Sequence, residues 1–287
     1  MEKKISKLYG DYITGKIERR SFVKKLSMVF GGTVAISTFL PLFEVNYLKA
    51  AEKINAEELL FIEQITFKGE TGEMKAFLAR PKEKKRYPAV IVIHENKGLQ
   101  PHIKNVNKRM AMEGFLAIAP DALSPMGGTP DNDVDLARTR MRELDMEKTI
   151  KNFTAAVKYL KTHPLSTGKV GCTGFCWGGA MTNKVAVNAP NLDAAVPYYG
   201  SQPAKEDVLK IKAPVLAHYA GDDARINKGI DAFKEALKAA GVEHQTFIYE
   251  GAKHAFNNDS NPERYHEEAA KLAWKRTIDF FKEKLDS

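Results

Sequence analysis

The stretch GFCWGG at residues 174–179 places Cys176 midway between two glycines, directly after an apolar run. A Gly-x-nucleophile-x-Gly sequence between a strand and a helix is typical of a sharp turn that lifts the central side chain above a sheet edge. Gly174 and Gly178 would leave room for that turn, and a helix N-terminus favours a thiolate. The same residues also fit a small buried cysteine packed as an apolar side chain, so this motif alone leaves both interpretations open.

Two later segments favour the catalytic interpretation. The acidic pair Asp222 and Asp223 follows a later apolar run, and His254 lies in the loop after the last such run. Nucleophile, acid and base occur in this order in α/β-hydrolases, where the acid orients the histidine and the histidine moves the proton. We take Asp223 as the acid, with Asp222 as the alternative.

Residues 59–285 alternate between short apolar runs and amphipathic stretches. The runs predict strands at 59–67, 74–81, 89–95, 115–123, 169–176, 192–200, 214–221 and 244–251. The other stretches predict helices at 103–114, 146–164, 178–190, 229–241 and 263–285. This alternation indicates an α/β fold of the α/β-hydrolase kind, with a mostly parallel sheet covered by helices on both faces. Functional side chains then gather beyond the carboxyl ends of the strands, and residues 124–145 predict a loop at the rim.

Seven segments together resemble the dienelactone hydrolases, also called carboxymethylenebutenolidases, over roughly residues 60–285. They are VIHENKGL, PDAL, LDMEKTI, GKVGCTGFCWGGA, YYG, GDDARI and EGAKHAF. The resemblance implies that Cys176 attacks the carbonyl of a lactone or small ester, and that His254 and Asp223 complete a triad. The expected intermediate is a thioester acyl-enzyme.

The resemblance also implies roles for residues around the thiol. Glu95 would hold the resting thiol and take up its proton when substrate displaces it. The backbone N–H groups of Trp177 and Asn96 would bind the oxyanion, and Tyr199 would form part of the pocket wall, with a core role equally open.

One departure concerns the substrate. Typical family members clamp a substrate carboxylate with arginines, one of them four residues after the catalytic histidine. Asn258 occupies that place here, and Arg138 in the rim segment is the substitute we name. A broad carboxylesterase therefore stays open as an alternative. A non-catalytic exported binding protein on the same fold also stays open, because an oxidisable thiol is unusual in an exported protein.

The charge distribution and the cysteine spacing limit the kinds of partner and cofactor that we expect. Residues 1–50 hold nine Lys and Arg against four Asp and Glu, which leaves only +3 of the net charge of +8 for the rest. Nucleic-acid binding therefore has little support, and a small-molecule substrate is expected. Cys172 and Cys176 would lie too far apart on one strand for a disulfide, and their spacing fits no zinc site. No phosphate, flavin or nicotinamide motif occurs, so neither metal nor cofactor is expected.

The first fifty residues resemble a twin-arginine export signal. Arg19 and Arg20 precede residues 26–43, which carry no charge, and small residues follow near Ala50. We expect export to the periplasm or the cell exterior, with membrane contact only during export. The alternative is an uncleaved anchor formed by residues 26–43. The predicted division is therefore a signal segment, 1–50, and a hydrolase domain, 51–287.

Overall fold

The computed structural model describes Lys25 and residues 59–286 of the chain. The residues from Leu60 onward form one compact unit. The predicted export segment lies outside the described residues apart from Lys25, so export and the boundary at residue 50 stay predictions from the sequence. Among the described helices, none is long and apolar enough to cross a membrane.

An eight-stranded sheet in the order β1-β2-β4-β3-β5-β6-β7-β8 forms the centre of this unit. β1 and β2 run antiparallel to their neighbours, and every pair from β4 to β8 is parallel. The prediction of a mostly parallel sheet is confirmed. The strands are β1 Leu60–Gly69, β2 Gly72–Pro81, β3 Tyr87–Ile93, β4 Leu116–Pro120, β5 Ser166–Phe175, β6 Ala194–Tyr198, β7 Val215–Asp222 and β8 His244–Lys253.

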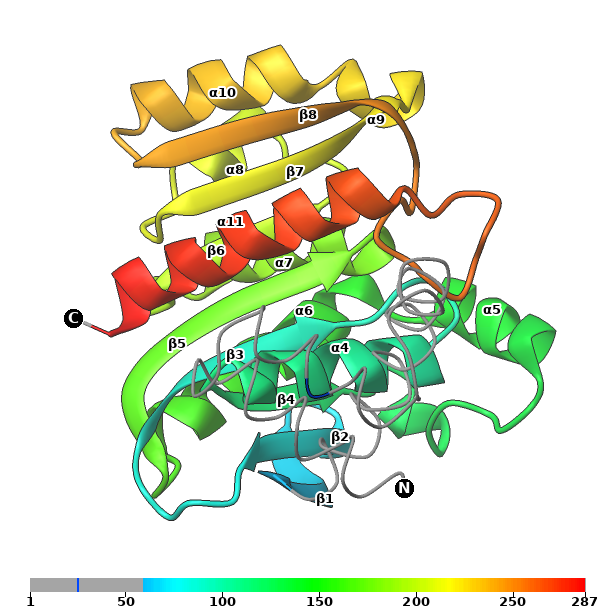
Figure 1. The fold of residues 1–287 in the computed structure, drawn as a ribbon, viewed down its shortest axis with the longest axis vertical. Coiled ribbons are helices and arrows are strands. Elements are labelled where there is room, and N and C mark those ends of the chain that lie inside the picture. Colours follow the sequence, from blue (N-terminus) through cyan, green and yellow to red (C-terminus); the bar gives the residue numbers. More distant parts are fainter. Residues whose placement is uncertain (1–24, 26–58, 287) are drawn as a thin grey trace. The chain divides into compact units, whose positions relative to one another are not determined.

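Helices cover both faces of the sheet. The longer ones are α4 Pro101–Met112, α5 Val134–Glu143, α6 Met146–Thr162, α7 Trp177–Asn188, α10 Ile230–Ala239 and α11 Glu267–Leu285. Short turns of helix occur at η1 Ser124–Met126, α8 Lys205–Val208 and α9 Ala224–Asn227. α11 crosses the sheet near β5 and β6 (Figure 1), and its Trp274 ring lies 5.5 Å from the Arg109 guanidinium of α4.

The core explains why the central strands carry no alternating polar pattern. β3 lies between β4 and β5, and five consecutive residues, Ala89–Ile93, are fully buried because helices pack on both faces. On one face Ile91 and Val170 join Phe153 of α6 and Val185 of α7 in a single apolar core. The parallel strands are thereby held with their carboxyl ends at one edge of the sheet.

The segment 124–145 differs from the prediction of a loop, because it contains the helix α5. Asp133 caps the helix by accepting a hydrogen bond from the Leu136 N–H at 2.8 Å. Only Ala137 and Met141 of α5 are buried. The apolar face of the helix is therefore too narrow to give a clear helical pattern in the sequence after the Gly- and Pro-rich residues that precede it. The prediction of a loop over the whole segment was wrong for residues 134–143.

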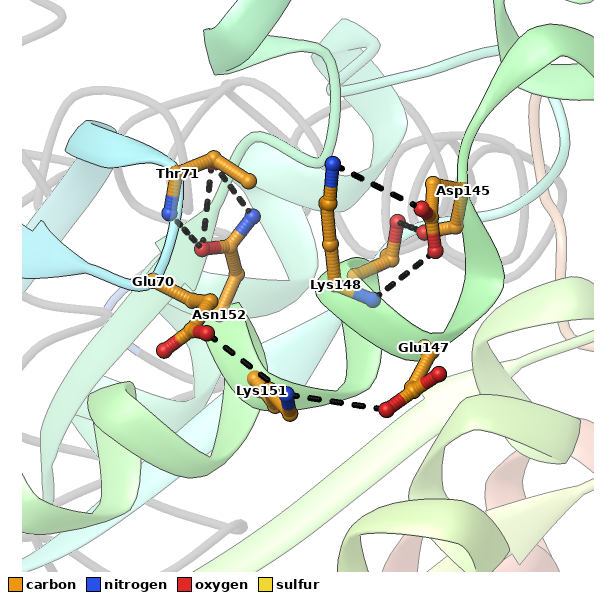
Figure 2. A network of polar contacts seen from close by, with 8 residues as sticks. Glu70, Thr71, Asp145, Glu147, Lys148, Lys151 and Asn152 are labelled. Carbon is orange, nitrogen blue, oxygen red and sulfur yellow. Dashed lines mark hydrogen bonds and ion pairs between the residues drawn. The ribbon is translucent and has the colours of Figure 1, made fainter.

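A polar network fixes the N-terminal half of α6 against the turn between β1 and β2 (Figure 2). Asn152 Oδ1 accepts from the Thr71 N–H at 3.1 Å, and Asn152 Nδ2 donates to Thr71 Oγ1 at 2.9 Å. Asp145 caps the helix through the Lys148 N–H at 3.1 Å. Phe153, which follows Asn152 on α6, packs edge-on against the ring of Trp177, the residue after Cys176. The network therefore supports the wall behind the candidate site.

Candidate active site

Cys176 occupies the tight turn between β5 and α7. Its φ of 57° and ψ of −113° lie outside the ordinary allowed regions, a strain that costs roughly 1–3 kcal/mol and is typical of functional sites. The two flanking glycines allow this turn. A Cβ on Gly174 would lie 2.3 Å from the Gly178 carbonyl oxygen, and one on Gly178 would lie 2.4 Å from the Ile93 carbonyl oxygen. The turn is thus packed directly against the end of β3.

The thiol meets a histidine and a carboxylate in line. His254 Nε2 lies 3.0 Å from Cys176 Sγ, and His254 Nδ1 lies 2.5 Å from Asp223 Oδ2. Asp223 is buried and also accepts from the Ile226 N–H as the cap of α9, whereas its neighbour Asp222 is exposed. The structure therefore brings Cys176, His254 and Asp223 together beyond the ends of β5, β8 and β7, and it directs Asp223 rather than Asp222 at the imidazole.

The surroundings of Cys176 favour the protonated thiol. Burial, followed by the negative charge of Glu95, raises the pKa of the Cys176 thiol to about 11, although the Trp177 N–H and the Arg225 guanidinium act in the opposite direction. At neutral pH the resting sulfur therefore keeps its proton. A base in contact with Sγ is needed before the thiol can attack a carbonyl, and His254 Nε2 is in that position.

Glu95 does not contact the thiol. Its Oε2 accepts a hydrogen bond from Asn258 Nδ2 at 2.9 Å, while Oε1 is buried without a hydrogen-bond partner among the described residues. Asn258 is held in this orientation because its Oδ1 accepts from both the N–H and the hydroxyl of Ser260, at 3.1 and 2.6 Å. The sequence-based expectation that Glu95 holds the resting thiol is thus not matched by a contact, and Asn258 is directed at Glu95.

Removing the charge of Glu95 should make the thiol more acidic. In Glu95→Gln the negative charge that disfavours the thiolate is lost, so we expect iodoacetamide to alkylate Cys176 faster than in wild type between about pH 7 and 9. The measurement is the alkylation rate against pH, followed by mass spectrometry. Glu147→Gln removes an exposed carboxylate on α6 and should leave the rate unchanged. An equal or slower rate in Glu95→Gln would contradict this assignment.

Aromatic side chains surround Cys176, His254 and Asp223. Tyr199 is fully buried with a φ of 37°, and its ring centroid lies 5.2 Å from that of His254. Trp177 is half-buried, its ring is stacked 5.5 Å from His94, and its backbone N–H is directed at the thiol. Asn96 is exposed and lies three residues after Ile93, the last residue of β3. The carbonyl oxygens of Ile93 and His94, just before it, lie close to Gly178.

Two arginines are placed differently from the sequence-based expectation. Arg138 lies on α5, where its guanidinium pairs with Asp135 at 2.9 Å, and it makes no contact with the triad among the described residues. Arg225, which sequence reasoning missed, is exposed on α9 and close enough to Cys176 to lower the pKa of the thiol. Its position two residues after Asp223 was the available signal, because a residue so near the acid shares its end of the sheet.

Within the described part of the chain, no three His, Cys, Asp or Glu side chains converge as they would around a metal ion. Both described cysteines are free. Cys172 is fully buried, and burial raises the pKa of its thiol to about 12, so it is an inert core residue beside the strained Cys176.

Comparison with known proteins places the chain in a family. Residues 74–285 match the Dienelactone hydrolase family. The chain belongs to this family. A protein from Yersinia pestis with the name "Putative carboxymethylenebutenolidase" is 32% identical over 232 residues, which cover 76% of this chain and 86% of that protein. The prediction of a hydrolase of the dienelactone hydrolase family is thereby confirmed.

Solved structures agree with this membership. The crystal structure named "Putative Dienelactone Hydrolase" from Klebsiella pneumoniae is 29% identical, covers 77% of this chain and 98% of its own, and has a TM-score of 0.69. Dienelactone hydrolase from Anabaena variabilis shares the fold at 21% identity, with coverage of 79% and 99% and a TM-score of 0.61. The predicted α/β-hydrolase fold is confirmed.

Proposed function

We propose that this protein is a cysteine-dependent hydrolase that opens a lactone or small ester through a thioester acyl-enzyme. The observation that carries the proposal is the line of contacts from Cys176 Sγ through His254 to Asp223, at 3.0 and 2.5 Å. The strained turn that holds Cys176 and membership of the dienelactone hydrolase family support it further. The substrate is a small carboxylic ester, cyclic or open.

Acylation begins with proton transfer. His254 Nε2 takes the proton of Cys176 as Sγ bonds to the carbonyl carbon, and Asp223 stabilises the imidazolium through Nδ1. The carbonyl oxygen becomes an oxyanion held by the backbone N–H groups of Trp177 and Asn96. When the tetrahedral intermediate collapses, the C–O bond breaks and His254 returns the proton to the leaving oxygen. In a lactone this oxygen stays attached to the acyl chain.

Deacylation repeats the same proton path with water. His254 accepts a proton from a water molecule as its oxygen bonds to the thioester carbon, and the same two N–H groups hold the second oxyanion. Collapse breaks the C–S bond, and Sγ recovers its proton from His254. The products are a carboxylic acid and the resting thiol, so atoms and charge balance without a cofactor.

Glu95 has a supporting role in this scheme. Its negative charge raises the pKa of the Cys176 thiol, which keeps the sulfur protonated between turnovers. A protonated thiol is less readily oxidised than a thiolate, which would suit the export that the sequence predicts.

The test of the proposed function is turnover by the full chain before and after its thiol is blocked. We expect a short aryl ester and a dienelactone to be hydrolysed, and both activities to fall together as iodoacetamide labels Cys176. Labelling can be followed in the same samples by mass spectrometry, with Cys172 as the internal buried control. An inert Cys176 with no ester turned over would favour the non-catalytic alternative, and undiminished turnover after full labelling would exclude the thiol mechanism.

A broad carboxylesterase is the second candidate, because Asn258 is engaged with Glu95 and Arg138 lies away from the triad. Arg225 is the exposed cation that remains near the thiol. If it attracts a substrate carboxylate, Arg225→Ala should lower kcat/KM for a carboxylated lactone roughly two- to fivefold, the usual range for an exposed charge pair. Neutral aryl esters should lose less, because for them only the effect of Arg225 on the thiol pKa is removed.

The control for Arg225→Ala is Lys238→Ala, which removes an exposed cation from the last turn of α10. Steady-state kinetics on both substrates, at low and high salt, separates the two candidates. Equal effects of Arg225→Ala on charged and neutral esters would leave the carboxylesterase as the better description.

A further inference from the structure

His94 contacts the peptide group that carries one of the two proposed oxyanion donors. The side chain is fully buried, one residue beyond β3. Its Nε2 lies 3.0 Å from the Ala122 N–H, which can only donate, so Nε2 is the acceptor. The proton of the neutral ring is therefore on Nδ1, which donates to the Glu95 carbonyl oxygen at 2.7 Å.

Burial is the main cause that lowers the pKa of His94, although the nearby charge of Asp121 acts in the opposite direction. The ring is therefore neutral at neutral pH. This agrees with one nitrogen that accepts and one that donates, and it fixes a single tautomer.

The Glu95 carbonyl and the Asn96 N–H belong to one planar trans peptide, so they point in opposite directions. A hydrogen bond that holds the carbonyl on the buried side therefore directs the Asn96 N–H away from the His94 ring. The neighbouring backbone supports the placement at the site, because the His94 carbonyl oxygen would lie only 2.5 Å from a Cβ on Gly178.

The same imidazole also supports the second proposed donor, the Trp177 N–H, through a stacking contact on its ring face. The ring of His94 stacks on that of Trp177, with centroids 5.5 Å apart and planes 11° from parallel. Phe153 packs edge-on against Trp177 at 6.2 Å. The backbone N–H of Trp177, directed at the thiol, thus belongs to a residue whose ring is fixed by His94 and Phe153.

We propose that His94 is a positioning residue that aligns the oxyanion hole, by holding the Glu95–Asn96 peptide through Nδ1 and the Trp177 ring by stacking. The inference rests on the proposed function. His94 touches no reacting atom. It acts on the tetrahedral oxyanion through the Asn96 N–H, a type of donor whose loss costs about 10²- to 10³-fold in turnover.

Two substitutions separate the bonds that His94 makes. His94→Asn places an amide nitrogen near the position of Nδ1 and can still donate to the Glu95 carbonyl. His94→Gln extends toward Ala122 and loses the donor to Glu95. The matched control is His244→Gln, because His244 Nδ1 also lies 2.9 Å from a backbone carbonyl, that of Val242, at the opposite end of the parallel strands.

Three readouts distinguish positioning from general damage to the site. Ester hydrolysis needs the oxyanion hole, and so does a reversible aldehyde inhibitor that adds to Cys176 as a hemithioacetal. Alkylation of Cys176 by iodoacetamide forms no carbonyl oxyanion. For His94→Gln we expect kcat to fall about 100-fold with KM within a few-fold, aldehyde affinity to fall by a similar factor, and alkylation to stay within about twofold. His94→Asn should recover most of the loss.

The inference is overturned if His94→Gln retains wild-type kcat, if alkylation falls in parallel with hydrolysis, or if Asn and Gln cause equal losses. Should His94→Gln fail to fold, which labelling of the buried Cys172 would reveal, His94→Phe is measured in its place. A Cys176→Ala variant in the same series distinguishes failure of the proposed function from failure of the inference about His94. If that variant still turns over ester, the proposed function fails, and if only the His94 variants behave like wild type, this inference alone fails.

Discussion

Cys176→Ala is expected to lose ester and lactone hydrolysis by on the order of 10⁴- to 10⁶-fold in kcat, as removal of a triad nucleophile does in other hydrolases. Without Sγ no thioester can form, and His254 is left without the group whose proton it accepts. The measurement is steady-state hydrolysis of an aryl ester and a dienelactone by the full chain.

The control for that variant is Cys172→Ala, which removes the other described thiol. Cys172 lies four residues earlier on β5, buried and 3.8 Å from the Thr182 hydroxyl, on the core side of the strand. Its loss should reduce stability slightly and leave kcat of the folded protein unchanged. Cys176→Ala with more than about a tenth of wild-type kcat would contradict a thiol nucleophile.

Asp223→Asn is expected to lower kcat about 10³- to 10⁴-fold. The amide can donate to His254 Nδ1, which favours the tautomer with its proton on Nε2, and that tautomer cannot accept the proton of Cys176. It also removes the charge that stabilises the imidazolium. KM should change little, because Asp223 is buried behind the imidazole.

The neighbouring acid supplies a matched comparison. Asp222 is exposed at the end of β7, so Asp222→Asn removes an equal charge one residue away and should change kcat less than about twofold. Steady-state kinetics across pH 5–9 measures both variants. If Asp222→Asn caused the larger loss, the acid of the triad would have been assigned to the wrong residue.

The proximity of Cys176, His254 and Asp223 could be predicted from the sequence because it depends on strand order and direction. The apolar runs predicted at 169–176, 214–221 and 244–251 become parallel strands that end at Phe175, Asp222 and Lys253, so the residues near their ends meet at one edge of the sheet. Glycines on both sides of Cys176 predicted the tight turn, and the close approaches at Gly174 and Gly178 give its physical reason.

Contacts that depend on side-chain rotamers could not be predicted in this way. The interpretation of Glu95 as a partner of the resting thiol came from family resemblance, whereas the local geometry directs its carboxylate to Asn258, which Ser260 holds in place. The buried bonds of His94 to Ala122 and to its own chain neighbour leave no pattern in the sequence. Export also stays a prediction, since its signal lies outside the described residues.

The most direct test of the central claim is detection of the acyl group on the thiol. Wild-type protein mixed with an aryl ester and quenched in acid within the first turnover should gain the mass of one acyl group. Peptide mapping should place it on Cys176, and hydroxylamine should remove it, as expected for a thioester. Rapid turnover with no acylated protein, or an acyl group on another residue, would contradict the proposed mechanism.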